Sequence, residues 1–320
     1  MDQIQSINQD RLFGIVDCGT NTFNLLIGKL VEGQWELVFS NKMPVKIGAG
    51  GFETKQIMPD RLARGLDVID HYHKVCKNYG VKDVYVFATS ALRDAHNADD
   101  FVQKVKSNNG WKVNIISGDE EAELIYEGVK RTKDFSQESA LIMDIGGGST
   151  EFIIVQNGVD VWRKSYPLGV SRLFEKVQPQ SRISQQDLQA LKKIIQETTW
   201  DLKEALEKFP CHLLVGSSGS FDTLLALYNQ SNKNGGQLEE DVCQEIPMAA
   251  FSSIHMQMMG STLEERLKNP AIPTIRAEYM PLSTYLVRFI LEMHPFQSVW
   301  RSPYALKEGV IFSKIINNRG

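Results

Sequence analysis

The sequence predicts two related α/β domains with a cleft between them, and two observations support this prediction. First, residues 15–22 and 142–150 share a pattern: an apolar stretch, an Asp, then Gly and hydroxyl residues, followed by a second apolar stretch. Two apolar runs around a tight turn are typical of a β-hairpin. Second, strand-like and helix-like stretches alternate over the first ~125 residues, which favours an α/β layer structure. We expect the two glycine-containing turns to face each other across the cleft.

The first half of the chain reads as a three-stranded meander followed by alternating helices and strands. Apolar side chains at Leu62, Leu66 and Ile69 lie on one face of an expected helix, and the run from Val84 to Ala88 is typical of a buried strand. We therefore expect strands at 12–16, 23–30 and 35–40, a helix at 60–79, a strand at 84–88, a helix at 98–107, a strand at 113–116 and a helix at 120–132.

The second half repeats this plan. A long helix is expected from Ser184, a typical N-cap residue, to Phe209. The polar segment 230–240 contains glycine and predicts a mobile loop, and helices are expected to dominate from Pro247 onward. Strands are expected at 140–143, 152–156, 161–166 and 213–215.

Composition and charge exclude several classes of protein. The 320 residues are 42% hydrophobic and 23% charged, as in a soluble globular protein, and the net charge of −4 provides no basic field for nucleic acid. No apolar run approaches the ~20 residues that span a bilayer, and the polar N-terminus has no signal core. The four cysteines lie far apart without metal-ligand spacing, which indicates buried free thiols. We expect a cytoplasmic protein that binds neither nucleic acid nor membranes.

The paired loops predict a phosphate and Mg²⁺ site. Glycines let backbone N–H groups approach an anion, hydroxyls add donors, and an Asp at the end of each leading strand suits Mg²⁺. A single loop of this kind could be only a structural turn, but the pair favours binding. The candidate metal ligands are Asp17 and Asp144, and the candidate phosphate-binding residues are Gly19, Thr20, Asn21, Gly146, Gly147, Gly148 and Ser149.

Five segments, taken together and in order, resemble the exopolyphosphatase/guanosine pentaphosphate phosphohydrolase family. They are DCGTNT at 17–22, ATSALRDA at 88–95, ISGDEEA at 116–122, DIGGGSTE at 144–151 and GSSG at 216–219. The resemblance implies the two ribonuclease-H-like domains of the actin, sugar kinase and heat-shock-chaperone superfamily. Two departures are Cys18, where the family has an aliphatic residue, and Glu278, where it has Asp.

The resemblance covers nearly all of the chain and is to the short, two-domain form of the family. The segment 302–310 resembles the closing family segment whose helix returns to the first domain. This implies a first domain made of residues 1–127 plus 301–320 and a second domain made of residues 128–300. Homodimers are common in the family, so a homodimer is expected.

The resemblance also assigns the general base. Acidic residues in a first helical turn favour the helix dipole, which alone would explain Glu120 and Glu121. The family, however, uses a glutamate of this segment to activate water. Glu121 aligns best with that role, and Glu120 is the alternative.

Further candidates come from the same motifs. Arg93 is expected to bind phosphate oxygens beside Ser90, and Lys46 is a weaker candidate for the same role. Glu151 follows the second loop and is a candidate metal ligand. Gly216 and Ser217 are candidates for phosphate contact, although their segment could instead bind a nucleoside or form only a turn.

These expectations together predict a Mg²⁺-dependent exopolyphosphatase that releases orthophosphate from the end of inorganic polyphosphate. The alternative is guanosine pentaphosphate 5′-phosphohydrolase, because its chemistry is identical and only the far end of the substrate differs. Two rivals from other classes are a sugar-kinase-like ATP phosphotransferase, which needs an acceptor hydroxyl and an adenosine pocket, and a nucleotide-sensing binding module without turnover.

Overall fold

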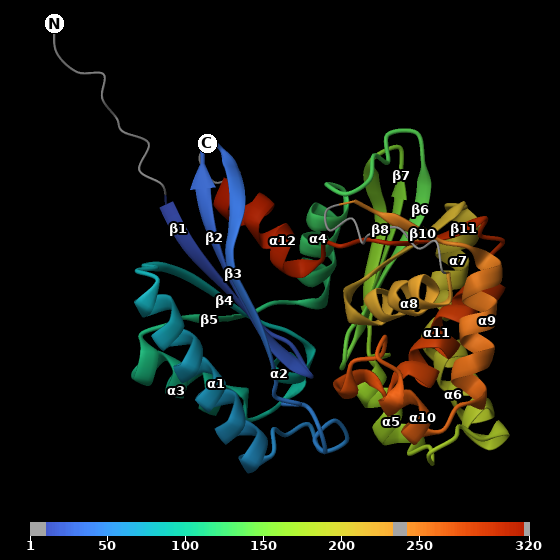
Figure 1. The fold of residues 1–320 in the computed structure, drawn as a ribbon, viewed down its shortest axis with the longest axis horizontal. Helices are drawn as coiled ribbons and strands as arrows, with labels where there is room; N and C mark the ends of the chain where they lie inside the picture. The colour runs from blue at the N-terminus through green and yellow to red at the C-terminus, as the bar shows by residue number, and fades with distance from the viewer. Residues whose placement is uncertain (1–10, 233–241, 317–320) are drawn as a thin grey trace, which may run out of the picture. The chain divides into compact units, whose positions relative to one another are not determined.

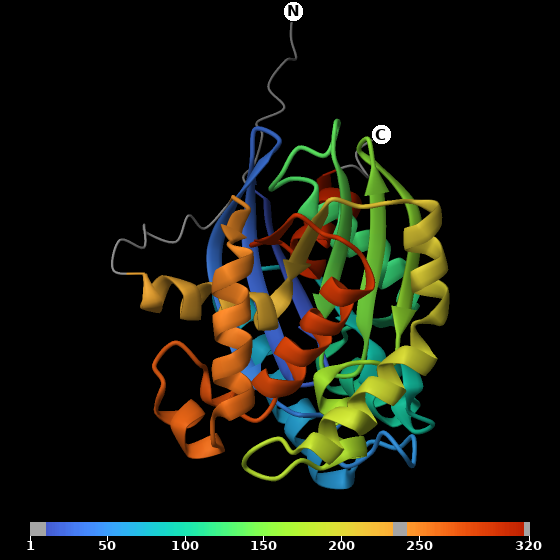
Figure 2. The ribbon, with the colours of Figure 1, turned by 90° about the vertical axis from the view of Figure 1, so that its right-hand side faces the viewer.

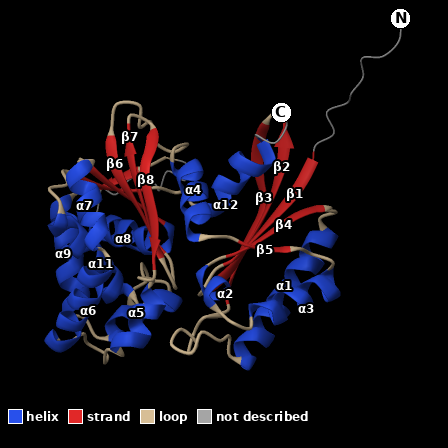
Figure 3. Cartoon of the chain, turned by 180° about the vertical axis from the view of Figure 1, so that it is seen from behind, coloured by secondary structure: helices blue, strands red, loops and turns tan. Residues whose placement is uncertain are grey.

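A computed structural model describes residues 11–232 and 242–316 and is an α/β structure throughout (Figure 1). The described residues form two compact units that divide between Ile116 and Ser117. Each unit is built on its own β-sheet, and helices pack on these sheets (Figure 3). Most of the segment 230–240, which was predicted to be a mobile loop, lies outside the described residues.

The first unit contains a five-stranded sheet in the order β3-β2-β1-β4-β5. Strands β1, β2 and β3 form the expected antiparallel meander, while β4 and β5 run parallel to β1. Its strands are β1 (Arg11–Cys18), β2 (Thr22–Val31), β3 (Gln34–Pro44), β4 (Asp83–Ala88) and β5 (Val113–Ile115), and its helices are α1 (Pro59–Asn78), α2 (Ser90–Asp94) and α3 (Ala98–Asn109).

The second unit contains a six-stranded sheet in the order β10-β11-β9-β6-β7-β8. Its strands are β6 (Ser139–Ile145), β7 (Thr150–Gln156), β8 (Val159–Tyr166), β9 (Leu213–Ser217), β10 (Gln244–Ile246) and β11 (Ser298–Arg301). Its helices are α4 (Gly118–Val129), α5 (Val170–Val177), α6 (Gln185–Thr198), α7 (Trp200–Lys208), α8 (Ser218–Ser231), α9 (Met248–Gly260), α10 (Leu263–Lys268), α11 (Met280–Met293) and α12 (Leu306–Val310), with a 3₁₀ turn at Thr274–Arg276 and a π-helical turn at Ile311–Ile316.

The two sheets share one topology, which confirms the predicted relation between the domains. Strands β8-β7-β6-β9-β11 repeat the order and directions of β3-β2-β1-β4-β5. Even the register shift in the middle strand of the meander recurs, between Ile27 and Gly28 in β2 and between Ile154 and Val155 in β7. Strand β10 is an addition at one edge of the second sheet.

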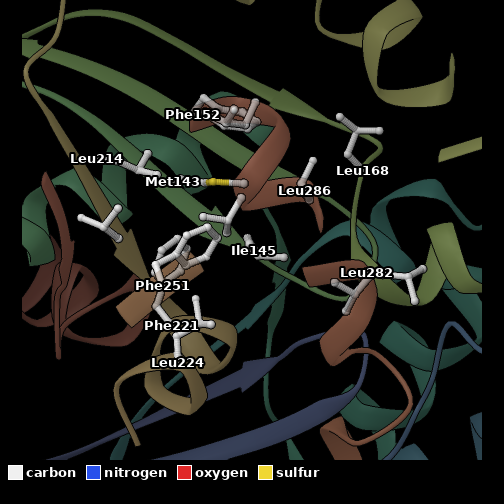
Figure 4. Packing of buried hydrophobic residues seen from close by; sticks show 14 of the residues in the cluster. Met143, Ile145, Phe152, Leu168, Leu214, Phe221, Leu224, Phe251, Leu282 and Leu286 are labelled. Carbon is white, nitrogen blue, oxygen red and sulfur yellow. The ribbon is translucent and has the colours of Figure 1, made fainter. Parts of the chain in front are cut away.

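Each unit has its own hydrophobic core. In the first, the rings of Phe23 and Phe101 pack edge to face at 5.9 Å, and the hydroxyl of Tyr72 donates to the carbonyl of Phe23 at 2.8 Å. In the second, Phe152 of β7 and Phe221 of α8 are fully buried against the helices (Figure 4). All four cysteines are buried and free, as predicted. None of the described helices is both long enough and apolar enough to cross a membrane.

The predicted helix at 184–209 is two helices, α6 and α7, which break at Thr199. The Thr198 and Thr199 hydroxyls donate back to the carbonyls of Ile194 and Ile195 at 2.7 and 2.8 Å. Such back-bonding by β-branched residues bends or ends a helix. The expectation that helices dominate after Pro247 missed β11, a four-residue strand that lies between β9 and β10.

Helix α4 packs against α12 within the second unit. A β-carbon on Gly309 of α12 would lie only 1.7 Å from the Leu124 carbonyl oxygen, so only glycine allows this approach. Both helices therefore belong to the compact unit that starts at Ser117, although 117–127 and 301–320 were assigned by resemblance to the first domain. The boundaries of the functional domains stay a prediction.

Asp201 joins α7 to the edge strand β8. It accepts a hydrogen bond from the Tyr166 hydroxyl at 2.7 Å and pairs with the Lys164 ammonium. Burial alone would raise the pKa of the Asp201 carboxyl. The hydrogen bonds from Lys164 and Tyr166 stabilise the charged form more strongly, so the pKa is lowered from its usual value. A lowered pKa in the folded state stabilises the fold above the unfolded pKa, and this contribution is lost as the pH falls through the folded pKa.

We predict that Asp201→Asn lowers the free energy of unfolding at pH 7 by about 1–2 kcal/mol, because a charged, partly screened hydrogen-bond acceptor is lost. The deficit relative to the wild type should shrink at an acidic pH below the lowered pKa of Asp201, because the wild-type carboxyl is then protonated in the folded state as well. Urea titrations at both pH values measure it. Glu207→Gln, which alters only an exposed pair with Lys203, is the control. A deficit that is equal at both pH values would contradict this account.

Candidate active site

Four polar side chains form a row across the second sheet, at the end of β6 that leads into the glycine loop. Strand register places Asp144 of β6 opposite Glu151 of β7 and beside Ser217 of β9, and it places Ser165 of β8 opposite Glu151. Directly paired residues on neighbouring strands point to the same face of a sheet. The row therefore runs Ser217, Asp144, Glu151, Ser165 across four strands.

The two carboxylates of this row are buried and accept hydrogen bonds from serines. Asp144 and Glu151 are 5% and 1% exposed. Asp144 Oδ2 accepts from Ser217 Oγ at 2.6 Å, and Glu151 Oε1 accepts from Ser165 Oγ at 2.7 Å. Two like charges on opposed positions repel each other, and burial strengthens that repulsion. The pair is therefore suited to a cation.

Ser218 adds a second hydroxyl to Asp144, and its backbone is strained. Its Oγ donates to the same Oδ2 atom at 2.7 Å. Ser218 is the first residue of α8 and has a φ of 65°, in the left-handed region that favours glycine. Strain of this kind persists where surrounding contacts enforce it, often at functional sites.

The first residues of helix α5 donate hydrogen bonds to the carbonyls of the second glycine loop. The backbone N–H groups of Val170 and Ser171 donate to the carbonyls of Gly146 and Gly147 at 3.0 and 2.9 Å. The guanidinium of Arg172, which is buried, donates through Nε to the Gly148 carbonyl at 2.8 Å. The loop carbonyls are thus turned toward α5, which fixes the conformation of the loop.

Helix α4, which carries Glu121, begins beside the same row. A β-carbon on Gly118, in the first turn of α4, would lie 2.4 Å from the Cβ of Ser165, so the helix start rests on the end of the row. Glu121, one turn further on, is only 8% exposed. Glu120 is different: its side chain is 41% exposed and pairs with Lys314 at 3.6 Å. Of the two candidate bases, Glu121 is the buried one.

The first unit carries the related loop after β1. Asp17 is paired in register with Asn24 of β2, and Asn24 Nδ2 donates to Asp17 Oδ2 at 2.9 Å. The carbonyl of Asn21 accepts from the backbone N–H groups of Val45 and Lys46, both at 2.9 Å. Gly19 and Thr20 lie in this loop, between β1 and β2. Asn24 holds the place that Glu151 has in the second unit.

Ser90 and Arg93 both lie on the short helix α2, which starts after β4, the parallel neighbour of β1. Ser90 is buried, and its hydroxyl donates to Asp94 at 3.4 Å. Arg93 donates through Nη1 to the carbonyl of Ile116 at 3.1 Å, a contact that orients the guanidinium. The carboxyl ends of adjacent parallel strands thus present the Asp17 loop and α2 at one edge of the first sheet.

The second unit therefore brings together Asp144, Glu151, Ser217 and the second glycine loop, and it places the start of α4, one turn before Glu121, against Ser165. The first unit brings together Asp17, its loop, Ser90 and Arg93. Sequence reasoning did not single out Ser165, Ser218 or Asn24. Asn24 could have been found, because it follows Asp17 by the same spacing as Glu151 follows Asp144. Ser218 lies in the quoted GSSG segment, whereas nothing in the sequence marks Ser165.

Among the described residues, no three His, Cys, Asp or Glu side chains gather as a complete metal site. Mg²⁺ needs no such cluster, because it commonly binds through one or two carboxylates together with water and substrate phosphates. The opposed carboxylates of Asp144 and Glu151 supply the hard oxygen ligands that Mg²⁺ prefers. The residues present therefore fit this ion.

We predict that Ser218→Gly is more stable than Ser218→Ala by roughly 1 kcal/mol, because both lose the hydroxyl but only Ala keeps a β-carbon in the left-handed conformation. Urea midpoints of the two variants measure the difference. The matched pair Ser220→Gly and Ser220→Ala, in the helical backbone of the same α8, should show the opposite order. Equal midpoints for the two Ser218 variants would show that the backbone relaxes.

Two solved structures resemble this chain over nearly its full length. The crystal structure of an exopolyphosphatase from Cytophaga hutchinsonii is 28% identical, covers 96% of this chain and 98% of its own, and has a TM-score of 0.93. The Ppx/GppA family member from Aquifex aeolicus, at 22% identity and a TM-score of 0.79, covers 97% of this chain and 99% of its own and shares the fold.

A curated relative from Aliivibrio fischeri, named guanosine-5′-triphosphate,3′-diphosphate pyrophosphatase, is 24% identical over 98% of this chain and 61% of its own length. The protein of the same name from Vibrio vulnificus is 25% identical over 94% of this chain and 59% of its own. The chain thus spans about three fifths of the length of these relatives.

The family model described as the Ppx/GppA phosphatase family matches residues 26–318. This match confirms the resemblance drawn from the five motifs, and the solved structures confirm the two-domain actin-like ATPase fold. Because this is a family of phosphatases, the match also confirms the predicted enzyme class at the level of the family. The chain belongs to the Ppx/GppA phosphatase family.

Proposed function

We propose that this protein hydrolyses the terminal phosphoanhydride bond of inorganic polyphosphate and releases orthophosphate. The observation that carries the proposal is the buried Glu121, on a helix whose start rests against the row containing Asp144 and Glu151. A carboxylate beside an anion- and cation-binding edge suits a reaction in which water attacks a phosphate chain. The similarity to the Cytophaga hutchinsonii exopolyphosphatase over nearly the full length of both chains supports the same substrate.

Glu121 is proposed as the general base. Its carboxylate accepts a proton from a water molecule as the water oxygen attacks the terminal phosphorus in line. The bond between that phosphorus and the bridging oxygen breaks, and the shortened chain leaves with the bridging oxygen. Orthophosphate is the second product. The exposure of Glu120 and its pairing with Lys314 favour Glu121 over Glu120 for this role.

The remaining candidates are proposed to bind the phosphate chain. Backbone N–H groups and hydroxyls of the glycine loops can donate to phosphate oxygens, and the contacts from α5 fix the second loop for that purpose. The Arg93 guanidinium offers a two-pronged donor for a phosphate group. The residues proposed for binding are Gly19, Thr20, Asn21, Ser90, Arg93, Gly146, Gly147, Gly148, Ser149, Gly216 and Ser217.

We propose that Asp144 and Glu151 hold Mg²⁺, with Asp17 as a further ligand candidate. When bound, Mg²⁺ would neutralise phosphate charge as the reaction proceeds. Ser217 and Ser218 restrict Asp144 to one orientation through two hydrogen bonds to Oδ2, and Ser165 does the same for Glu151. These serines would therefore position the ligand carboxylates, as second-layer hydrogen bonds do in metal sites.

A second candidate function is removal of the 5′-terminal phosphate of guanosine pentaphosphate. The curated relatives bear the name of that activity. The reaction at the terminal phosphate is the same, so Glu121, Asp144 and Glu151 would serve equally. Recognition of the guanosine end distinguishes the two substrates.

We predict rapid phosphate release from polyphosphate with Mg²⁺, compared side by side with guanosine pentaphosphate and ATP. Glu121→Gln should lower kcat by about 10²–10⁴-fold, because the general base is lost, while polyphosphate affinity changes little. Glu120→Gln is the matched control on the same helix turn and should retain activity.

The outcomes separate the alternatives. Faster release from guanosine pentaphosphate than from polyphosphate would favour the second candidate. Equal losses in the Glu120 and Glu121 variants would overturn the assignment of the base. No release from any substrate would overturn the proposed function and favour a binding module.

A further inference from the structure

A cavity of about 640 Å³ in the second unit is lined by residues of α6, α7, α9 and α11 and by Thr199 between α6 and α7. Figure 3 labels these four helices, and Figure 2 shows the second unit from another side. The volume of the cavity falls in the range typical of small-molecule sites, roughly 300–1,000 Å³. None of the candidate active-site residues lines it. The function proposed above therefore leaves this cavity unexplained.

The charge of the cavity is opposite to that of the chain. Its lining includes Lys192, Lys203 and Arg288 but only one carboxylate, Glu292, while the whole chain has a net charge of −4. Arg288 pairs with Glu292 at 2.6 Å. Lys203 has only a 4.0 Å contact with Glu207, and Lys192 makes no ion pair within the part of the chain that the structure describes. Two lysines are thus available to an anion.

Aromatic side chains surround the same space. Trp200 is 61% exposed, an unusual position for so large an apolar side chain, and it stands between Lys192 and Lys203 in sequence. Tyr285 and Phe289 of α11 contribute further rings. Flat aromatic faces beside lysines suit a ligand with a planar ring and an anionic group.

His255 supplies a polar group on the α9 side of the cavity. Its Nδ1 atom is buried and lacks a hydrogen-bond partner among the described residues. Its ring stacks on Phe251 with an interplanar angle of 19°, which holds it in place. Because this atom is itself buried, a ligand in the cavity could reach it only if the ring turned, and the imidazole would then offer the ligand a donor or an acceptor.

We infer that this cavity binds a nucleotide, with the base against Trp200 and the phosphate at Lys192 and Lys203. The aromatic rings suit the flat face of a base, the two available ammonium groups suit the phosphate, and the imidazole of His255 in the lining suits the edge of the base. None of the proposed hydrolytic residues lines this cavity, so it would be a ligand site distinct from the proposed active site.

The test uses AMP and GMP as probes, because neither contains a phosphoanhydride bond that the proposed reaction could cleave. Isothermal titration of the full chain should show saturable binding of at least one probe with a Kd in the micromolar range. The double variant Lys192→Glu/Lys203→Glu should bind at least about tenfold more weakly, because each charged contact to phosphate is lost. Trp200→Ala should weaken binding to a similar extent.

Lys193→Glu is the matched control. Lys193 neighbours Lys192 on α6, but it is not part of the cavity lining and pairs with Glu197 at 3.9 Å, so binding should be unchanged. Ribose 5-phosphate, which lacks the base, should bind more weakly than either nucleotide. These rim positions are exposed, and equal thermal midpoints for all variants would verify folding.

Absence of saturable binding of both nucleotides up to about 1 mM would overturn the inference. So would equal losses in the Lys193 control and the double variant. Equal affinity for ribose 5-phosphate and the nucleotides would also contradict it, because the aromatic faces would then contribute nothing. Since turnover is not measured, failure here is independent of the proposed hydrolysis.

Discussion

The pairing of β6 with β7 on one side and with β9 on the other is the constraint on which the candidate active site depends. It aligns Ser217, Asp144 and Glu151 on one face, and the pairing of β7 with β8 adds Ser165 to the row. A shift of one residue in the register of β6 would turn Asp144 to the opposite face. Two helices contact this region of the sheet. The start of α4 packs against Ser165, and α5 donates hydrogen bonds to the loop that follows Asp144.

Features with a local signal were predictable from the sequence, and those created by tertiary contact were not. The hairpins around Asp17 and Asp144 follow from apolar runs around glycine turns, and both were found. The break at Thr199 depends on two side-chain hydrogen bonds, which override the helical pattern of the flanking residues. Strand β11 has only two apolar residues, Val299 and Trp300, so no apolar run marks it in the sequence, and it is defined by its pairing with β9 and β10. Ser165 gains its place only through strand pairing with Glu151.

The two copies of the shared topology differ at one chemically decisive position. In the first, Asp17 faces the amide of Asn24, which donates to it and offsets its charge locally. In the second, Asp144 faces Glu151, and the hydroxyls of Ser217, Ser218 and Ser165 donate to these two carboxylates. At this pair of positions the first copy therefore has one carboxylate and one amide, whereas the second has two carboxylates. Duplication of the fold thus has not produced two equivalent sites.

The position of β11 in the second sheet determines the order in which the chain can fold during synthesis. All described residues of the first unit precede Ser117, and domains generally fold as units with the N-terminal one first during synthesis. The second sheet lacks its β11 strand until residues 298–301 are available, and α4 gains its partner α12 only with residues 306–310. The helix that carries Glu121 is therefore among the first parts of the second unit to be made and among the last to be secured.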